Sequence, residues 1–396
     1  MTTGPRIAAA IVLLTLAGAT PAFPEEPLSL HVFGDPWSDT RHTIHSFGAE
    51  IDTGDYNYGD PTPAEQAHLE YINRARLDPQ AEADRLLGGD LNEGITDTGN
   101  LISTEPKPPL ALNASLIEAA RLHSADMIAN DYFAHESQDG RTPWDRMEAA
   151  GYVTWFTAAE NIAISLSTSP LDEVDTITGF HDGFVIDEGI TGRGHRINIF
   201  KANLKEVGVG AATGAMHYNG VDWSHTWTLT CDFGSRTDSG IFVLGVVYGD
   251  VDTNGWYSAG EGRGGVTLAA VRASDAARAL TTTASAGGYG IPLSPGRYTV
   301  HATLSDGSAA LQMVELSDRN VKIDFELADF SDLPVCGMPG DVDGNGGIDL
   351  ADAMLALQAL AGISHGEPIC AESAVGGRER IGLPEVMYVL RAAAGG

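Results

Sequence analysis

The stretch Gly192-Arg-Gly-His-Arg-Ile-Asn-Ile199 places a histidine, His195, directly after a glycine-flanked turn. Two earlier stretches, Phe133-Ala-His135 and Ala159-Glu160-Asn-Ile-Ala163, contribute a second imidazole and a carboxylate. Two imidazoles and one carboxylate can ligate zinc with one position left open, or serve as a general acid and base. The three residues are far apart in the chain, so their spacing alone does not bring them together.

These motifs stand in the order found in the CAP superfamily of cysteine-rich secretory, antigen 5 and plant pathogenesis-related proteins, and the stretch 64–234 resembles its bacterial branch. Four more motifs carry the resemblance: Tyr71-Ile-Asn-Arg-Ala-Arg76, His123-Ser-Ala-Asp-Met127, Lys205-Glu-Val-Gly-Val-Gly210 and Thr230-Cys-Asp-Phe-Gly234. The resemblance implies an α+β fold, an α-β-α sandwich with an antiparallel sheet between two helical layers and a cleft on one face.

The resemblance also implies that His135, Glu160 and His195 line this cleft as candidate catalytic residues, and that His135 and His195 are candidate zinc ligands. A second glutamate of the family cleft is not secured in this chain, which reads Phe180-His-Asp-Gly-Phe184 in that region. His181 is therefore either a cleft residue or a residue on a helix surface. His123 lies on an apolar helix face, which predicts a hydrogen-bonded core residue.

Local signals predict the helices and strands of this first domain, residues 61–235. Thr62-Pro-Ala-Glu65 offers an N-cap, a helix-starting proline and a capping-box glutamate, and Asp78-Pro79 interrupts the helix that follows. Asn113 begins a second amphipathic helix. Alternating runs at 207–211 and 227–233 predict strands that close the domain.

Residues 240–330 consist of short β-branched runs separated by Gly, Asp and Ser, which predicts a small β-sandwich. An oxygen-rich loop begins this unit and matches the spacing of a calcium-binding loop. It resembles the calcium loops in B-type repeats of bacterial surface proteins, which have a transthyretin-like sandwich. An ordinary Asp/Asn-Gly turn is the alternative. Its candidate calcium ligands are Asp250, Asp252, Asn254, the carbonyl of Trp256, and Glu261.

The last unit, residues 334–396, contains an internal duplication of a loop followed by an amphipathic helix. The first loop has the pattern of an EF-hand calcium loop and resembles half of a dockerin. In the second copy Ala374, Gly376 and Arg378 replace three oxygen ligands, so we expect no calcium there. The candidate calcium ligands of the first loop are Asp341, Asp343, Asn345, the carbonyl of Gly347, Asp349 and Asp352.

The charge of the chain restricts its partners. Its 396 residues include 54 acidic and 23 basic side chains, for a formal net charge of -31. Such a surface repels nucleic-acid phosphates, so we expect no nucleic-acid partner. Divalent cations are the natural partners of clustered carboxylates, and we expect Ca²⁺ as a cofactor, with Zn²⁺ in the cleft as a second candidate.

The N-terminus predicts export. Residues 1–23 combine Arg6, an apolar run from Ile7 to Ala17 and small residues at a cleavage site, as in a secretory signal. Residues 24–60 read as an N-terminal arm, and no later segment is apolar enough to span a membrane. Export allows a disulfide between Cys336 and Cys370. Cys231 reads as a small buried residue.

Three functions fit these patterns. The preferred one is a secreted calcium-binding protein whose CAP-like domain binds a small ligand (a lipid, sugar or peptide) or an extracellular protein. The second is an extracellular hydrolase, a protease or an enzyme acting on polysaccharide or envelope, that uses His135, Glu160 and His195. The third is a cellulosome-type component docked on a cohesin, which the degenerate second loop disfavours.

Overall fold

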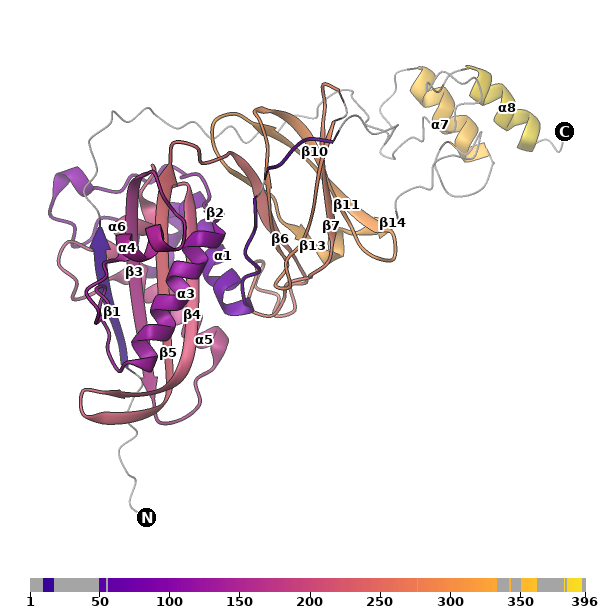
Figure 1. Cartoon of the computed structure of the whole chain (residues 1–396). Helices are drawn as coiled ribbons and strands as arrows, with labels where there is room; N and C mark the ends of the chain where they lie inside the picture. The colour runs from indigo at the N-terminus through magenta and orange to yellow at the C-terminus, as the bar shows by residue number, and fades with distance from the viewer. Residues whose placement is uncertain are drawn as a thin grey trace, which may run out of the picture.

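The structure is a computed structural model that describes residues 10–17, 50–54, 56–275, 277–332, 342, 350–361, 381 and 383–393. Figure 1 shows an α/β unit, drawn from indigo to pink, beside a unit of strands drawn in pink to orange. We call the first, residues 10–17 and 56–236, the α/β unit and the second, residues 242–332, the β-sandwich. The fold is therefore α+β, as the sequence predicts.

The helices of the α/β unit begin where the capping residues predict. Thr62 and Glu65 form a reciprocal capping box at the start of the first helix, and Asp78 both ends that helix and caps the next. Asn113 accepts from two backbone amides and caps the third helix. The helices are α1 (Pro63–Leu77), α2 (Pro79–Leu86), η1 (Thr98–Asn100), α3 (Ala114–Ala129), α4 (Pro143–Ala149), α5 (Glu173–Ile186) and α6 (Gly194–Phe200).

One five-stranded sheet, in the order β1-β3-β5-β4-β2, crosses the α/β unit. Its members are β1 (Ala10–Ala17), β2 (Ala111–Leu112), β3 (Trp155–Ser167), β4 (Glu206–Tyr218) and β5 (Val221–Arg236). All pairs are antiparallel except β2 with β4. The predicted strands at 207–211 and 227–233 lie within β4 and β5. Residues 10–17 of the predicted signal segment form β1, and removal of the segment on export stays a prediction.

Helices cover both faces of this sheet. Neighbouring residues on a strand point to opposite sides, so β3 contributes side chains to both layers. On one face Ile162 and Ile164 of β3 share a core cluster with Met127 of α3. On the other face Ala159 and Ala163 belong to a larger core with residues of α1, α5 and α6. The α-β-α layering that the resemblance implies is thus present.

The β-sandwich consists of two sheets that enclose one core. The first has the order β14-β11-β10-β7-β8, and the second is built around β6, which pairs with β9, β12 and β13. Val243, Leu268, Val300 and Phe325 are among its buried core residues. Its strands are β6 (Phe242–Tyr248), β7 (Thr267–Arg272), β8 (Arg278–Thr282), β9 (Gly288–Pro292), β10 (Gly296–Thr303), β11 (Ser308–Leu316), β12 (Val321–Lys322), β13 (Phe325–Glu326) and β14 (Ser331–Asp332), with η2 (Leu327–Asp329) before the last.

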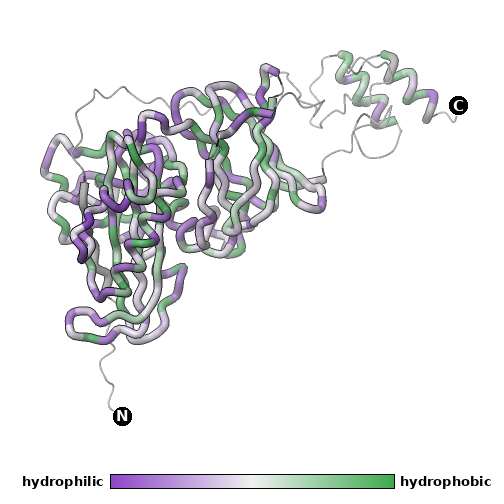
Figure 2. The backbone as a smooth tube through the Cα atoms, in the orientation of Figure 1, coloured by the Kyte–Doolittle hydropathy of each residue, from purple (hydrophilic) through white to green (hydrophobic). Residues whose placement is uncertain are grey.

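Polar contacts join the two units at a seam. The Lys322 ammonium of β12 lies 2.8 Å from a carboxylate oxygen of Glu70 on α1, and both side chains are buried. The side-chain amide of Asn320 donates to the Pro109 carbonyl at 3.0 Å. In Figure 2, hydrophobic segments lie mainly along the strands of both units, whereas hydrophilic segments are frequent in the connecting loops.

Two helices are described in the last unit, α7 (Leu350–Leu360) and α8 (Leu383–Ala393), and they contact each other. The predicted disulfide between Cys336 and Cys370, and the calcium ligands other than Asp352 in the loop at 341–352, lie outside the described residues. Cys231 is buried and unbridged, as predicted. Within the described part of the chain no helix is long and apolar enough to cross a membrane.

Gly208 on β4 lies at a close approach of the sheet to the backbone of α3. A Cβ at this position would lie 2.0 Å from the carbonyl carbon of Leu116, which is backbone and cannot move aside. We predict that Gly208→Ala lowers the free energy of unfolding by about 3 kcal/mol, the upper end of the usual cost of overpacking. Urea unfolding measures this change.

Gly99→Ala is the matched control, because its nearest neighbour would be the Asp97 carboxylate at 3.4 Å. We expect a change within about 0.5 kcal/mol for this variant. Equal unfolding midpoints for the two variants would show that α3 does not pack on β4 as described.

Candidate functional site

His135 and Glu160 form a hydrogen-bonded pair. Nδ1 of His135 lies 2.6 Å from Oε1 of Glu160. Glu160 projects from β3 and is completely buried, whereas the His135 side chain, in the loop after α3, is 13% exposed. Since an ionised carboxylate only accepts, His135 donates through Nδ1–H. This tautomer leaves Nε2 as the basic nitrogen of the ring.

Arg146 of α4 holds this pair in place. Its Nη2 donates to Oε2 of Glu160 at 2.6 Å, and its Nη1 donates to the backbone carbonyl of His135 at 2.8 Å. The guanidinium is buried, so it gives the Glu160 carboxylate the compensating charge that burial requires. Burial raises the pKa of Glu160 to about 7, with Arg146 acting in the opposite direction.

His195 forms a second pair with Asp187. Nδ1 of His195 lies 2.6 Å from Oδ1 of Asp187, and neither side chain is exposed. Oδ2 of Asp187 accepts from the backbone amides of His195 and Arg196, at 2.9 and 3.3 Å. The N-cap residue of α6, Arg193, makes no side-chain cap, so Asp187 satisfies the orphan amides of that helix.

The Asp187 backbone is left-handed, with φ of 54°, at the end of α5. Asp is one of the few residues other than Gly that adopt this conformation at low cost. It turns the chain so that the carboxylate reaches α6. Asp187 therefore supplies the second acid of the site, which we did not identify from the sequence.

The two histidine–carboxylate pairs approach β3 from opposite faces of the sheet. Glu160 lies on the α3 and α4 side, with Ile162. The next residue, Asn161, points the other way and donates to the backbone carbonyl of His195 at 3.1 Å. Within the described residues, Glu160 and Asn161 of β3 are thus the link between the pairs.

His181 belongs to neither pair, and its burial corrects the helix-surface alternative; its role in a cleft stays a prediction. It is fully buried on α5, and its Nε2 lies 2.8 Å from Oε1 of Glu82 on α2. Burial lowers the pKa of His181. His123 is buried and its Nε2 lies 3.0 Å from the Ala134 carbonyl, so the prediction of a hydrogen-bonded core residue is confirmed.

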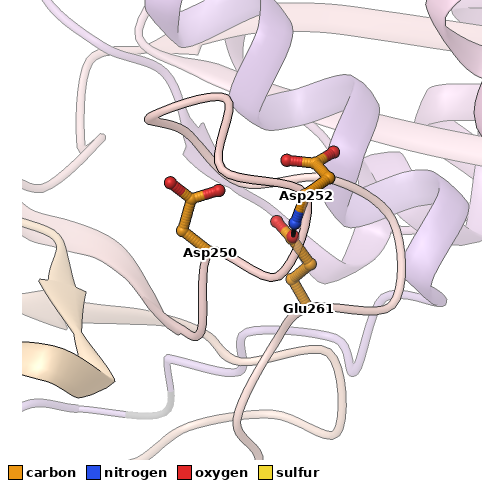
Figure 3. Close-up of side chains that lie close together, drawn as sticks. All are labelled: Asp250, Asp252 and Glu261. Atoms are coloured by element: carbon orange, nitrogen blue, oxygen red, sulfur yellow. Dashed lines mark hydrogen bonds between the residues drawn. The ribbon is translucent and has the colours of Figure 1, made fainter.

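The loop at 250–261 brings three acidic side chains together. Oxygens of Asp250, Asp252 and Glu261 all lie within 4.8 Å of one another. Figure 3 shows the three carboxylates on one loop, with Glu261 reaching back toward Asp252. Asp250 accepts from the backbone amides of Asn254 and Gly255, both at 3.0 Å, so the loop curls around the first carboxylate.

The carboxylate of the twelfth loop residue makes the same contact in both candidate calcium loops. Oε1 of Glu261 accepts from the amide of Val251, the second loop residue, at 2.7 Å. In the C-terminal loop, Oδ1 of Asp352 accepts from the amide of Val342, again the second residue, at 2.6 Å. Two loops in different folds thus share one closing contact.

Residues 69–233 match the model of the cysteine-rich secretory protein family, named CAP. We refer to the α/β unit as the CAP domain, after the family model that this part of it matches. Over 102 residues the chain is 33% identical to the uncharacterized protein YkwD of Bacillus subtilis, a match that covers 26% of this chain and 34% of that protein. The chain thus spans about a third of the length of this relative.

Two solved structures are similar to parts of the chain. One is an extracellular protein containing a SCP domain from Bacillus anthracis, with 25% identity over 33% of this chain and 35% of the other, and a TM-score of 0.23. The other is a type II cohesin–X-dockerin complex from Acetivibrio cellulolyticus, with 20% identity over 38% of this chain and 94% of the other, and a TM-score of 0.18.

The CAP domain meets part of the requirement for a zinc site. Metal-binding histidines usually donate their second ring nitrogen to a carboxylate, and both His135 and His195 do so. Among the described residues, however, only the loop with Asp250 gathers three ligating side chains. Because the two pairs approach β3 from opposite faces, this structure does not gather His135, Glu160 and His195 into the single cleft that the resemblance implies. Zinc binding by His135 and His195 stays a prediction, and no reaction step is derived from it.

We predict that Asp187→Ala destabilises the CAP domain by about 2 kcal/mol or more, because it removes a helix cap and leaves His195 without its buried partner. Denaturant unfolding measures the loss, and hydrogen exchange at the His195 and Arg196 amides should accelerate. Glu188→Ala is the control, since Glu188 is exposed. If both variants unfold alike, Asp187 does not cap α6.

Asp187→Asn separates the two roles of the side chain. Asn tolerates the left-handed backbone and keeps an oxygen for the amides of α6. We expect this variant to retain the cap, so that the His195 and Arg196 amides exchange about as slowly as in the wild type and faster only in Asp187→Ala.

Proposed function

We propose that the chain is an exported, calcium-stabilised protein whose CAP domain is an extracellular binding module. The observation that carries the calcium part is the convergence of Asp250, Asp252 and Glu261 within 4.8 Å. Three carboxylates at this distance repel one another unless a cation lies between them. Ca²⁺ accepts six to eight oxygen ligands, and the Asn254 side chain and the Trp256 carbonyl stand at the remaining loop positions.

The whole chain favours such a cation. A net charge of -31 produces a negative field that concentrates divalent cations near the surface. The C-terminal loop at 341–352 is the second proposed calcium site, supported by its oxygen spacing and by the closing contact of Asp352 with Val342.

Calcium should raise the stability of the ion-stripped chain. A ligand that binds only the folded state adds about 2.7 kcal/mol at a concentration one hundred times its Kd. We expect a higher Tm on adding calcium, reversed by a chelator, in thermal unfolding followed by circular dichroism. Asp250→Asn combined with Asp252→Asn should abolish the response of the β-sandwich.

Bound ions can be counted by equilibrium dialysis. We expect two calcium ions per chain in the wild type. We expect one ion in Asp250→Asn with Asp252→Asn, and one ion in Asp341→Asn with Asp343→Asn. Asp222→Asn with Asp238→Asn is the charge-matched control, because both carboxylates are exposed. Equal binding by the control and the variant at 250 and 252 would reject the site in the β-sandwich.

The candidate catalytic residues are buried in the chain that retains β1. Glu160 and His195 are fully buried, and His135 is only slightly exposed, so no substrate bond reaches them in this state. β1 pairs with β3 along Ala159–Leu166 and contacts α5 and α6. Removal of this segment on export would uncover the edge of β3 for a ligand.

Export is supported by the N-terminal sequence, which has the pattern of a secretory signal. A hydrolase would show activity on peptide or polysaccharide substrates that His195→Ala abolishes. Such activity would replace the binding module as the proposed role of the CAP domain and would leave the calcium proposal intact.

A further inference from the structure

The pairing of β4 with β5 is interrupted close to the turn that joins them. Ala215 of β4 and two neighbours on β5, Ser224 and His225, have no partner in the ladder between these strands. Figure 1 shows the β4–β5 hairpin curling outward at the lower end of the α/β unit. An interruption of this kind bends a strand and redirects its side chains, and it is frequent beside functional sites.

A pocket of about 360 Å³ lies at this interruption. The three unpaired residues line it, and so do Thr213 of β4 and Trp227 of β5. An apolar part of the lining comes from the loop between β3 and α5, and consists of Pro170 and Leu171. Residues of three separate segments thus enclose one space.

The side chains of Trp227, His225 and Thr213 point to one face of the sheet. Trp227 packs against the core that includes residues of α1, α5 and α6. His225 lies two residues before it on a strand that pairs regularly with β3 here, so it points the same way. Thr213 is the direct partner of Trp227 on β4. An indole, an imidazole and a hydroxyl group therefore lie together on this face.

The polar groups of the pocket are unpaired and its lining is almost free of charge. Within the described part of the chain, the ring nitrogens of His225 and Trp227 make no hydrogen bond. The indole of Trp223, by contrast, donates to the Tyr218 carbonyl at 3.2 Å. No Asp, Glu, Lys or Arg lines the pocket, although the chain has 54 acidic and 23 basic side chains. The pocket therefore offers hydrogen bonds without a strong local charge.

These properties discriminate between classes of ligand. A divalent cation would find no carboxylate there, and an anion would approach against the negative field of the chain. A lipid chain would cover the indole, imidazole and hydroxyl groups without giving them hydrogen bonds, which costs free energy for each group. A pyranose ring suits both parts of the lining, because its C–H face packs on an aromatic ring and its hydroxyls donate and accept.

We propose that this pocket binds a neutral, β-linked glycan, with one pyranose ring against Trp227 and its hydroxyls bonded to His225, Thr213 and Ser224. We infer the gluco configuration, because its equatorial substituents leave flat C–H faces for the indole. The inference rests on the proposed role of the CAP domain as a binding module, and it names the class of ligand and its place. Neither histidine–carboxylate pair lines the pocket, and β1 contributes no residue to it.

Nuclear magnetic resonance of the full chain, with ¹⁵N-labelled Trp and His at a fixed calcium concentration, tests the proposal. The probes are cellotetraose, a neutral oligosaccharide of β-linked glucose, and chitotetraose, its N-acetylglucosamine counterpart. We expect saturable shifts of the Trp227 indole N–H and of the His225 ring. The Trp223 indole should not move, because it lies outside the pocket and is already hydrogen-bonded.

Two matched pairs of variants locate the binding. Trp227→Ala should raise the Kd for the bound sugar about tenfold, whereas Trp223→Ala should leave it within twofold. His225→Ala should raise the Kd about fivefold, through the loss of a hydrogen bond. Its control is His217→Ala, because His217 is exposed and outside the pocket. If Trp227→Ala does not fold, His225→Ala and Thr213→Val carry the test.

Three results would overturn the proposal. One is the absence of saturable shifts with either oligosaccharide, and another is an equal loss of binding in the control variants. The third is a shift of the Trp227 and His225 signals by a fatty acid such as laurate but by neither sugar, which would make this a lipid site. Calcium uptake by the same samples is measured separately, so a chain that binds calcium but no sugar loses this inference and keeps the calcium part of the proposed function.

Discussion

The register between β3 and β5 is the constraint on which the CAP domain depends. It sets Glu160 opposite Asp232, and Asn161 opposite Cys231. A slip of one residue would turn Glu160 to the other face of the sheet, away from Arg146 and into the apolar layer beneath α5 and α6. A buried carboxylate that loses its partner costs about 3–5 kcal/mol, so the polar cluster itself selects the register.

Buried cations organise the segments that have no regular structure. Arg76 of α1 is fully buried and donates to the backbone carbonyls of Pro108, Ile199, Lys201 and Leu204. Arg146 performs the same task for the loop that carries His135. Buried carbonyls need donors, and a guanidinium provides five in one rigid group. In the described part of the CAP domain, arginine side chains therefore fix irregular segments, among them the loop that carries His135.

Local chemistry made part of this structure predictable. The capping residues Thr62, Asp78 and Asn113 indicated three helix starts, because a cap is read from a few neighbouring residues. The cross-strand partnership of Asp232 and the link between His181 and Glu82 were not predictable in this way, since each depends on how distant elements meet. Asp187 was missed because its role follows from a left-handed backbone that Asp adopts only sometimes.

The candidate calcium loop of the β-sandwich lies against the CAP domain. The Arg74 guanidinium of α1 sits 4.9 Å from the centre of the Trp256 ring, and Trp256 is the loop residue whose carbonyl would face the cation. Nearby, Lys322 lies between Glu70 of α1 and Asp324, so the seam is held by charge. A cation that fixes the backbone at Trp256 would also fix this ring on α1. The two units would then respond to calcium together, because the loop that orders is part of their contact.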